Sequence, residues 1–336
     1  MTRGNEPPPA TAAGLSPRIY QFDTRLAGGP EQWADHLGRV AAMQFDWVLV
    51  DGPARDAGFD QLAAFCANAQ AAGLRVLGDA VPDRSDPDLA GPMHRLIEAG
   101  IAGFRCRHAH RLDAAAWSHL FADLRRQAPG TVFLGDAIGA PLNDLLALEP
   151  AGFDLVFNSA CWWDFNAPWA LEQYDLLRRF TRTVTFPESP YGPRLADTLG
   201  RLQPEMLEAA YRSRYAFAAS FSAGVLMPMG FEYAAAGTLP GGWDAVRNAA
   251  PFDLSAYVGE VNELKESLPP LALESRIMRL DSPDAPLAAL LHLDHELGSE
   301  AAGAVIVCLN PGYTPRRFTG LHRAVFALDG GIAALR

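Results

Sequence analysis

The sequence is poor in cysteine. Its four cysteines, Cys66, Cys106, Cys161 and Cys308, lie far apart and form neither a CxxC pair nor a Cys/His cluster. A disulfide framework or a zinc site needs such spacing, so the sequence favours neither. We expect reduced thiols and a cytoplasmic protein, and we expect no metal and no cofactor.

Positive charge is also scarce. Lys and Arg together number 28 against 39 Asp and Glu, which gives a formal net charge of -11, and no Lys/Arg-rich run is present. Nucleic acids and anionic membranes attract clustered positive charge. The composition therefore argues against both as partners and favours a neutral or modest-sized substrate.

Long apolar runs are missing as well. No window approaches the roughly 18 uninterrupted apolar residues of a membrane-spanning helix. The start, "MTRGNEPPPATAAGLSP", carries prolines where a signal peptide needs an apolar core. We expect a protein that is neither exported nor membrane-spanning, with a flexible lead-in over residues 1–16.

Short β-rich runs alternate with longer amphipathic stretches, which is the pattern of repeated βα units and a parallel sheet. No GxGxxG turn follows the first run, so the units indicate a (β/α)8 TIM barrel over residues 17–268 and not an open doubly wound sheet. The predicted strands are 18–22, 45–51, 74–80, 102–107, 131–137, 153–159, 182–188 and 223–230.

Two of the intervening stretches illustrate the outer helices. One repeats Trp33, Leu37 and Val40 at helical spacing, and another ends at Gly73, a predicted C-cap. Beyond about residue 270 the pattern changes, and we predict a small antiparallel β domain over residues 269–336. Its predicted strands lie in "ESRIMRLDS", "LAALLHLDH", "GAVIVCLNP" and "HRAVFALDGG".

Polar residues close most of the predicted barrel strands. Active sites of (β/α)8 barrels lie at the C-terminal ends of the strands, so these residues are candidates for a site. For any single acid the alternative is that it caps the following helix. The set comprises Asp79, Asp83, Arg84, Arg105, Arg107, His108, Asp136, Asn158, Glu188, Tyr191 and Glu232.

Six motifs follow one another in a familiar order. They are "SPRIYQFDTRLAGGPEQWADHLGRVAAMQFDWVLVDG", "GFRCRHAHRLDAAAW", "VFLGDAIGAP", "AGFDLVFNSACWWDFNAPWALEQYDLLRRF", "FPESPYGPRLAD" and "SAGVLMPMGFEY". Over about residues 17–330 the chain resembles glycoside hydrolase family thirteen, the α-amylase family, and most of all its bacterial maltosyltransferase-like branch. The resemblance implies a barrel that acts on α-1,4-linked glucans by a retaining mechanism.

The resemblance also implies three catalytic positions, and all three differ here. The nucleophile position falls on Arg107, the acid position on Asp136, which is shorter than the glutamic acid of the family, and the position of the stabilising aspartate on Tyr191. Retention needs two carboxyl groups about 5 Å apart. A positive charge about 4 Å from a developing oxocarbenium ion opposes it by about 4 kcal/mol, roughly a thousandfold in rate. We therefore expect no retaining glycosidase activity.

The arginines suggest a second use of the site. Arg84, Arg105 and Arg107 suit bidentate binding of phosphate or carboxylate, for example the phosphate of maltose 1-phosphate, the donor that the resemblance implies. The alternative is a salt bridge from Arg107 to Asp136 or Asp79. Glu188 also has a structural interpretation, as a framework acid. Trp162, Trp163, Phe165 and Trp169 could stack on sugars, with core or inter-helix packing as the alternative for Trp162 and Trp169. The other ligand-binding candidates are Asp79, His108, Asn158, Trp163 and Glu188.

Two hypotheses for function follow. The first is a degenerate α-amylase-family protein that binds α-glucan, maltooligosaccharide or maltose 1-phosphate, or that regulates an active relative. The second is an active α-glucan transferase or hydrolase that uses Asp136 with non-family groups. The segments between the second, third and fourth strands are short where the family carries long cleft loops, which favours the first. The family's habit also makes a homodimer plausible.

Overall fold

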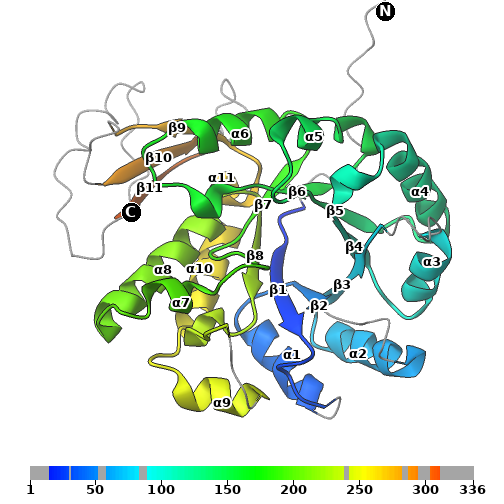
Figure 1. Ribbon diagram of the computed structural model, residues 1–336, viewed down its shortest axis with the longest axis horizontal. Helices are drawn as coiled ribbons and strands as arrows, with labels where there is room; N and C mark the ends of the chain where they lie inside the picture. The colour runs from blue at the N-terminus through cyan, green and yellow to red at the C-terminus, as the bar shows by residue number, and fades with distance from the viewer. Residues whose placement is uncertain are drawn as a thin grey trace, which may run out of the picture.

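Eight parallel strands close into a barrel in chain order, with β1 pairing both β2 and β8 (Figure 1). The computed structural model describes residues 15–29, 32–51, 58–82, 89–237, 242–281, 287–293 and 303–310. The closed barrel confirms the predicted fold class, and all eight predicted strands are present with small shifts at their ends. They are β1 (Arg18–Asp23), β2 (Trp47–Asp51), β3 (Arg75–Ala80), β4 (Gly103–Arg107), β5 (Val132–Asp136), β6 (Leu155–Phe157), β7 (Arg182–Thr185) and β8 (Gly224–Pro228).

Helices connect the strands and surround the barrel (Figure 1). Asp113 caps α4 by accepting a hydrogen bond from Ala116 N at 2.8 Å. Gly73 follows the end of α2 with φ of 79°, a conformation that favours glycine. The α-helices are α1 (Trp33–Ala42), α2 (Phe59–Ala71), α3 (Ala90–Glu98), α4 (Ala114–Gln127), α5 (Leu142–Leu146), α6 (Trp169–Leu177), α7 (Leu195–Leu199), α8 (Pro204–Phe221), α9 (Gly242–Ala249), α10 (Ser255–Ser267) and α11 (Pro269–Ala272).

Short 3-10 turns follow several strands. They are η2 (Ala109–Arg111), η3 (Glu149–Ala151), η4 (Ala160–Trp162) and η5 (Phe231–Tyr233). Three of them, η2, η4 and η5, come directly after β4, β6 and β8. They therefore shape the end of the barrel where a site is expected. Across the described part of the chain, no helix combines the length and apolarity needed to cross a membrane.

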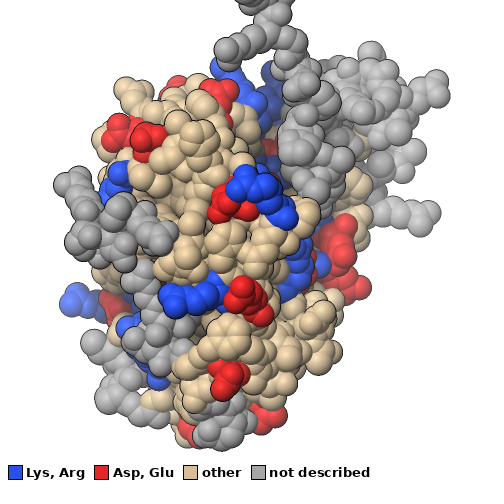
Figure 2. Space-filling model, turned by 90° about the vertical axis from the view of Figure 1, so that its right-hand side faces the viewer, with Lys and Arg blue, Asp and Glu red and all other residues tan. Residues whose placement is uncertain are grey.

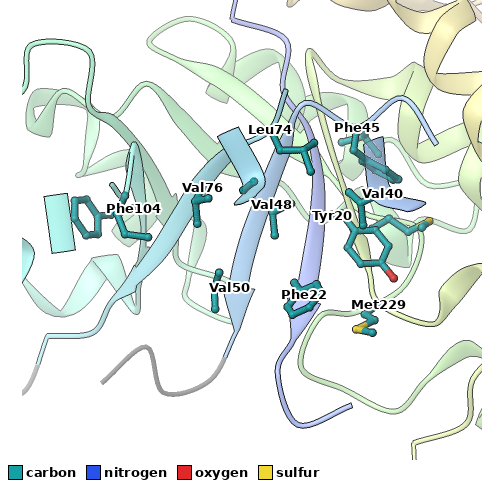
Figure 3. Packing of buried hydrophobic residues seen from close by; sticks show 14 of the residues in the cluster. Tyr20, Phe22, Val40, Phe45, Val48, Val50, Leu74, Val76, Phe104 and Met229 are labelled. Atoms are coloured by element: carbon teal, nitrogen blue, oxygen red, sulfur yellow. The ribbon is translucent and has the colours of Figure 1, made fainter. Parts of the chain in front are cut away.

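Alternation along the strands divides the core into two layers. One face of each strand packs inside the barrel, where Leu49, Leu77, Leu134 and Leu226 belong to one buried cluster made of strand residues. The other face packs against the helices. Figure 3 shows this outer layer, with Tyr20, Phe22, Val48, Val50, Val76 and Phe104 on the strands and Val40 on α1.

A three-stranded antiparallel sheet follows the barrel, as predicted. Its order is β11-β10-β9, with β9 at Arg276–Arg279, β10 at Ala288–Leu293 and β11 at Ala304–Leu309. It lies beside α6 and α11 in Figure 1, and Ile277 and Leu290 share a buried cluster with Phe217 and Phe221 of α8. The fourth predicted strand, in residues 322–331, lies outside the described residues.

A buried polar network joins this sheet region to the amino ends of the barrel strands. Glu274, between α11 and β9, accepts hydrogen bonds from Thr183 N at 2.8 Å, Thr183 Oγ1 at 2.7 Å and Ala223 N at 3.2 Å. Lys265 of α10 donates to Ser222 O at 2.7 Å and Leu271 O at 2.5 Å. The network therefore fixes the starts of β7 and β8, at the opposite end from the candidate site.

Charged side chains are scattered on the face of the molecule that Figure 2 shows. Acidic and basic groups alternate there among uncharged residues. No continuous basic area covers the described part of this face. This distribution agrees with the scarcity of positive charge in the sequence.

Candidate active site at the carboxyl ends of the barrel strands

Four charged residues meet at the carboxyl ends of β3, β4 and β5. The strand register pairs Asp79 with Arg105 and Arg107 with Asp136. Asp79 lies two positions beyond Leu77, which faces the barrel interior, and the same alternation applies to the other three residues. All four side chains therefore belong to the face that opens into the barrel mouth, as the sequence predicted for these positions.

Arg105 and Asp79 form the buried anchor of this cluster. Arg105 Nε and Nη2 donate to Asp79 Oδ1 and Oδ2, each at 2.6 Å, and the side chain of Arg105 is fully buried. A bidentate pair of this kind fixes the plane of the guanidinium group. The pair therefore ties β3 to β4 at the rim of the barrel.

Tyr191 reaches back across the mouth from the segment after β7. Its hydroxyl donates a hydrogen bond to Asp136 Oδ2. Its ring lies 5.2 Å from Arg105 Cζ and 4.7 Å from Arg107 Cζ, within the range of cation–π contacts. Desolvation of the hydroxyl raises the pKa of Tyr191 and the Asp136 carboxylate raises it further, although Arg105 opposes both. Tyr191 is therefore a neutral hydrogen-bond donor at neutral pH.

Arg107 has no charged partner within the described residues. Its ring contact with Tyr191 is present, but it makes no ion pair there with Asp136 or Asp79. Its Nε atom is buried and has no hydrogen-bond partner in that part of the chain. The predicted alternative, a salt bridge from Arg107 to either aspartate, is therefore not formed. Asp79 forms its ion pair with Arg105, and Asp136 accepts a hydrogen bond from Tyr191.

His108 follows Arg107 in a left-handed conformation, with φ of 52° and ψ of 41°. Burial lowers the pKa of His108, and the cations of Arg111 and Arg107 lower it further. The ring of His110 lies 6.3 Å from that of His108. Over the described ranges, no cluster of three or more His, Cys, Asp or Glu side chains could hold a metal ion.

Two predicted ligand-binding residues face away from the barrel mouth. Asn158 is buried, and its Nδ2 donates to Thr185 Oγ1 and Ser222 Oγ, both at 2.8 Å. Trp163 is 2% exposed and packs among aromatic rings of α8, so a sugar cannot stack on it. Asn158 faces outward from the barrel, and Trp163 lies in the buried cluster that α6 and α8 share with the antiparallel sheet, which corrects their assignment as ligand-binding residues.

Glu188 holds the segment after β7. Its Oε2 accepts a hydrogen bond from Leu195 N at 2.7 Å, at the start of α7, and its Oε1 lies 2.9 Å from Arg194 Nη2. Burial raises the pKa of Glu188, and the ion pair with Arg194 opposes that rise. These contacts agree with the framework interpretation of this acid. Asp83 and Arg84, the remaining predicted pair, lie outside the described residues.

Glu232, in η5 after β8, lies in the outer layer and not in the mouth. It is fully buried, accepts a hydrogen bond from Tyr20 Oη at 2.9 Å and pairs with Arg39 Nη1 of α1. Arg39 also donates to Tyr20 Oη at 2.9 Å. The three side chains fasten α1 to the first and last strands, which gives Glu232 a structural role.

The curated proteins include two relatives of the same kind. The α-1,4-glucan:maltose-1-phosphate maltosyltransferase of Burkholderia pseudomallei (strain K96243) is 29% identical over 90% of this chain and 33% of its own length. The maltosyltransferase of that name from Salinibacter ruber is 26% identical over 64% of this chain and 33% of its own length. The chain thus spans about a third of the length of these relatives. No protein-family model matches it.

Solved structures share the barrel. The α-amylase of Geobacillus thermoleovorans superposes with a TM-score of 0.68 at 12% identity, over 88% of this chain and 87% of that one. The cyclic α-maltosyl-(1→6)-maltose hydrolase of Arthrobacter globiformis gives a TM-score of 0.65 at 14% identity, over 89% and 91%. These low identities show a common fold alone. The similarity to maltosyltransferases comes from the curated relatives. The chain is similar to the α-1,4-glucan:maltose-1-phosphate maltosyltransferases.

The matched region of this chain is shorter than that of its relative. The alignment with the Burkholderia protein runs over 379 positions, more than the 336 residues of the chain. The relative therefore carries residues that have no counterpart here. In the structure α2 begins at Phe59, soon after β2 ends at Asp51, and α3 begins at Ala90, soon after β3 ends at Ala80. These are two of the places where short segments were predicted.

Sequence reasoning missed two features of the maltosyltransferase-like site. It did not foresee that Tyr191 reaches Asp136, because no local pattern joins residues 55 positions apart. It also left core packing and sugar stacking both open for Trp162, which is 50% exposed with its ring 5.6 Å from that of Phe186. A signal for the second was available, since neighbouring residues such as Trp162 and Trp163 seldom face the same way.

Replacing Tyr191 with alanine is expected to increase the affinity for inorganic phosphate about tenfold. An anion that approaches Arg107 must displace the Tyr191 ring and its hydrogen bond to Asp136, an interaction worth about 1.5–3 kcal/mol when one partner is charged. Isothermal titration calorimetry measures the change. Tyr191→Phe keeps the ring and removes only the hydroxyl, so its affinity for phosphate should lie between that of the wild type and that of Tyr191→Ala. Weaker phosphate binding by Tyr191→Ala would mean that the ring contacts the ligand.

Proposed function

We propose that this chain is a degenerate α-amylase-type barrel that binds an α-glucan or a sugar phosphate at its mouth and does not cleave glycosidic bonds by the retaining mechanism. The relationship to α-1,4-glucan:maltose-1-phosphate maltosyltransferases supports a carbohydrate ligand. The relatives are about three times longer than the matched region, so we do not assign their complete activity to this chain.

The observation that carries the proposal is the state of Arg107. A guanidinium group stands at the end of β4, where the resemblance requires a nucleophilic carboxylate, and Asp136 beside it is engaged by Tyr191. Retention needs a free carboxylate and a protonated carboxylic acid about 5 Å apart. The other nearby carboxylate, Asp79, is committed to Arg105. The arrangement supports ligand binding over covalent catalysis.

Among the described residues Arg107 has no ion pair, and this favours an anionic group on the ligand. A partly buried guanidinium without a protein carboxylate gains most from a ligand phosphate, which it can bind through two hydrogen bonds. The Nε atom of Arg107 is buried and lacks a partner within the described residues. Maltose 1-phosphate combines this phosphate with the sugar that the relatives' name prints, so it is the ligand to test first.

The decisive experiment incubates the protein with maltose 1-phosphate and glycogen and measures released phosphate and chain extension. We expect no turnover above that of the Asp136→Ala variant. Turnover in the wild type that Asp136→Ala abolishes would overturn the proposal and support an active transferase or hydrolase that uses Asp136.

Binding is measured in parallel with maltose 1-phosphate and with maltose. We expect the wild type to bind maltose 1-phosphate more tightly than maltose. In the Arg107→Ala variant, the affinity for maltose 1-phosphate should fall about tenfold or more relative to that for maltose, in line with the loss of a charge-assisted hydrogen bond. Arg126→Ala, which removes an exposed arginine of α4, is the matched control. Equal affinities of the wild type for both sugars would show that the phosphate group does not contribute to binding, which would contradict this part of the proposal.

A further inference from the structure

The turn that follows β4 is rich in basic side chains. Arg107 ends β4, His108 comes next, and His110 and Arg111 belong to η2. Strand alternation directs the Arg107 side chain into the barrel mouth. This basic turn, residues 107–111, therefore lies at the same end of the barrel as the candidate active site.

Buried contacts hold the basic turn in one conformation. Trp117 of α4 is fully buried, and its Nε1 donates to Ala109 O at 2.9 Å. Arg111 N donates to His108 O at 2.8 Å. The left-handed conformation of His108, with φ of 52° and ψ of 41°, is one that His, Asn and Asp adopt more often than most residues. The Cα–Cβ direction of His108 is therefore set before a ligand binds.

The imidazole of His108 is half-buried and has polar atoms without protein partners. Within the described residues, neither of its ring nitrogens takes part in a hydrogen bond or ion pair. Its ring meets that of His110 edge to face, with the centroids 6.3 Å apart. The Nε atom of the preceding Arg107 is also buried without a partner in that part of the chain. Both side chains therefore have donors available to a ligand in the mouth.

The charges around His108 are mainly positive. They come from Arg107 on β4, from Arg111 and His110 on η2, and from the carboxylate of Asp136 on β5. Burial lowers the pKa of His108, the two arginine cations lower it further, and Asp136 opposes them. The His108 ring is therefore neutral at pH 7 in the unliganded protein. A doubly negative ligand beside the ring would favour its protonated form.

We propose that His108 takes up a proton from solvent when a dianion such as a phosphate monoester binds at Arg107, so that the affinity for this anion rises as the pH falls. This role of His108 rests on the proposed function, which places an anionic group at Arg107. The imidazolium donates from both ring nitrogens, whereas the neutral ring donates from one. The protonated ring and the guanidinium then both donate charge-assisted hydrogen bonds to oxygens of the anion.

The test uses inorganic sulfate as the probe. Sulfate keeps two negative charges over the pH range of the experiment, whereas a phosphate monoester itself gains a proton near about pH 6. Calorimetry at pH 6 and pH 8 should show that the sulfate affinity of the wild type falls about tenfold as the pH rises, the effect of a shift of about one unit in the pKa of His108. At pH 7 the binding heat should vary with the ionisation enthalpy of the buffer in the direction of proton uptake.

Variants assign the proton to one histidine. His108→Asn keeps a residue type that tolerates the left-handed backbone, so it should bind sulfate at pH 8 about as tightly as the wild type and lose the increase at pH 6. His119→Asn, at an exposed histidine of α4, is the matched control and should keep the increase. NMR titration of the histidine rings in the wild type, with and without sulfate, is a second measurement that needs no variant. One histidine should titrate about one pH unit higher with sulfate.

The outcomes separate the role of His108 from the proposed function. Sulfate binding that depends on Arg107, strengthens at low pH and loses this dependence in His108→Asn supports the role. Sulfate binding of equal strength at pH 6 and pH 8, a pH dependence that survives His108→Asn, or histidine titrations unchanged by sulfate would overturn it and leave the proposed function standing. No sulfate binding at pH 6, or binding unchanged in Arg107→Ala, overturns both the role of His108 and the anion site of the proposed function.

Discussion

Between pH 7 and pH 9 the free energy of unfolding is expected to rise by about 2 kcal/mol through Lys265. This residue is the only lysine in the sequence and is 1% exposed. Burial lowers its pKa from the ordinary 10.5 to about 7, which outweighs the attraction of the Glu274 carboxylate. Between these two pH values the unfolded chain binds more protons than the folded one. Raising the pH therefore favours the folded state.

Urea unfolding at pH 7, 8 and 9 measures this effect. Lys265→Met should remove most of the rise, because the variant has no amine to titrate at this position. Glu263→Ala, on the same helix but exposed, should keep the full rise. Protein labelled with ¹⁵N-lysine contains a single such side chain, so its NMR titration gives the pKa directly. A pH dependence that is the same in Lys265→Met and the wild type would refute the prediction.

Replacing Glu274 with alanine is expected to lower the free energy of unfolding by about 3–5 kcal/mol. The carboxylate of Glu274 is buried and accepts hydrogen bonds from Thr183 N, Thr183 Oγ1 and Ala223 N. The substitution leaves these donors without an acceptor and also removes the negative charge that most favours the protonated form of the buried Lys265. The loss of the acceptor is costly because the donors it leaves unpaired are buried.

A conservative variant separates the two causes. Glu274→Gln keeps one acceptor oxygen and loses the charge, so it should be destabilised by less than Glu274→Ala. The measurement is urea unfolding at pH 8, with Glu263→Ala as the exposed control. A loss below about 1 kcal/mol for Glu274→Ala would show that the network is not needed for stability.

The two ends of the barrel differ in how their polar groups are satisfied. At the amino ends of β7 and β8, Glu274 and Lys265 are matched by protein partners. At the carboxyl ends, Arg107 keeps a buried nitrogen without a partner among the described residues. Stability is therefore expected to respond to substitutions at the first end, and ligand binding to those at the second.

Much of the fold could be predicted because its signals are local. Each strand appears in the sequence as a short β-rich run, and the alternation of such runs with amphipathic stretches is enough to indicate a parallel barrel. The strand ends differ most from the prediction. For example, β6 is shorter than predicted and spans Leu155–Phe157. Hydrophobic pattern alone does not show where backbone pairing stops.

The candidate site was predictable only in part. The sequence placed Asp79, Arg105, Arg107 and Asp136 at neighbouring strand ends, because position along a barrel strand follows from residue number. It also placed Asn158 there. The structure turns Asn158 toward Thr185 and Ser222, since the residue lies one position beyond Phe157, which faces the interior. A shift of one residue along a strand changes the face of the sheet.

By itself, the sequence determined the barrel and the antiparallel sheet that follows it, and it predicts a family nucleophile position at Arg107, because each depends on residues close together in the chain. Only the tertiary structure decided which side chain each aspartate meets. Arg105 takes Asp79, and Tyr191 takes Asp136 from 55 residues away. Such pairings depend on side-chain reach and burial in three dimensions, which no local pattern records. They leave Arg107 without an ion pair among the described residues.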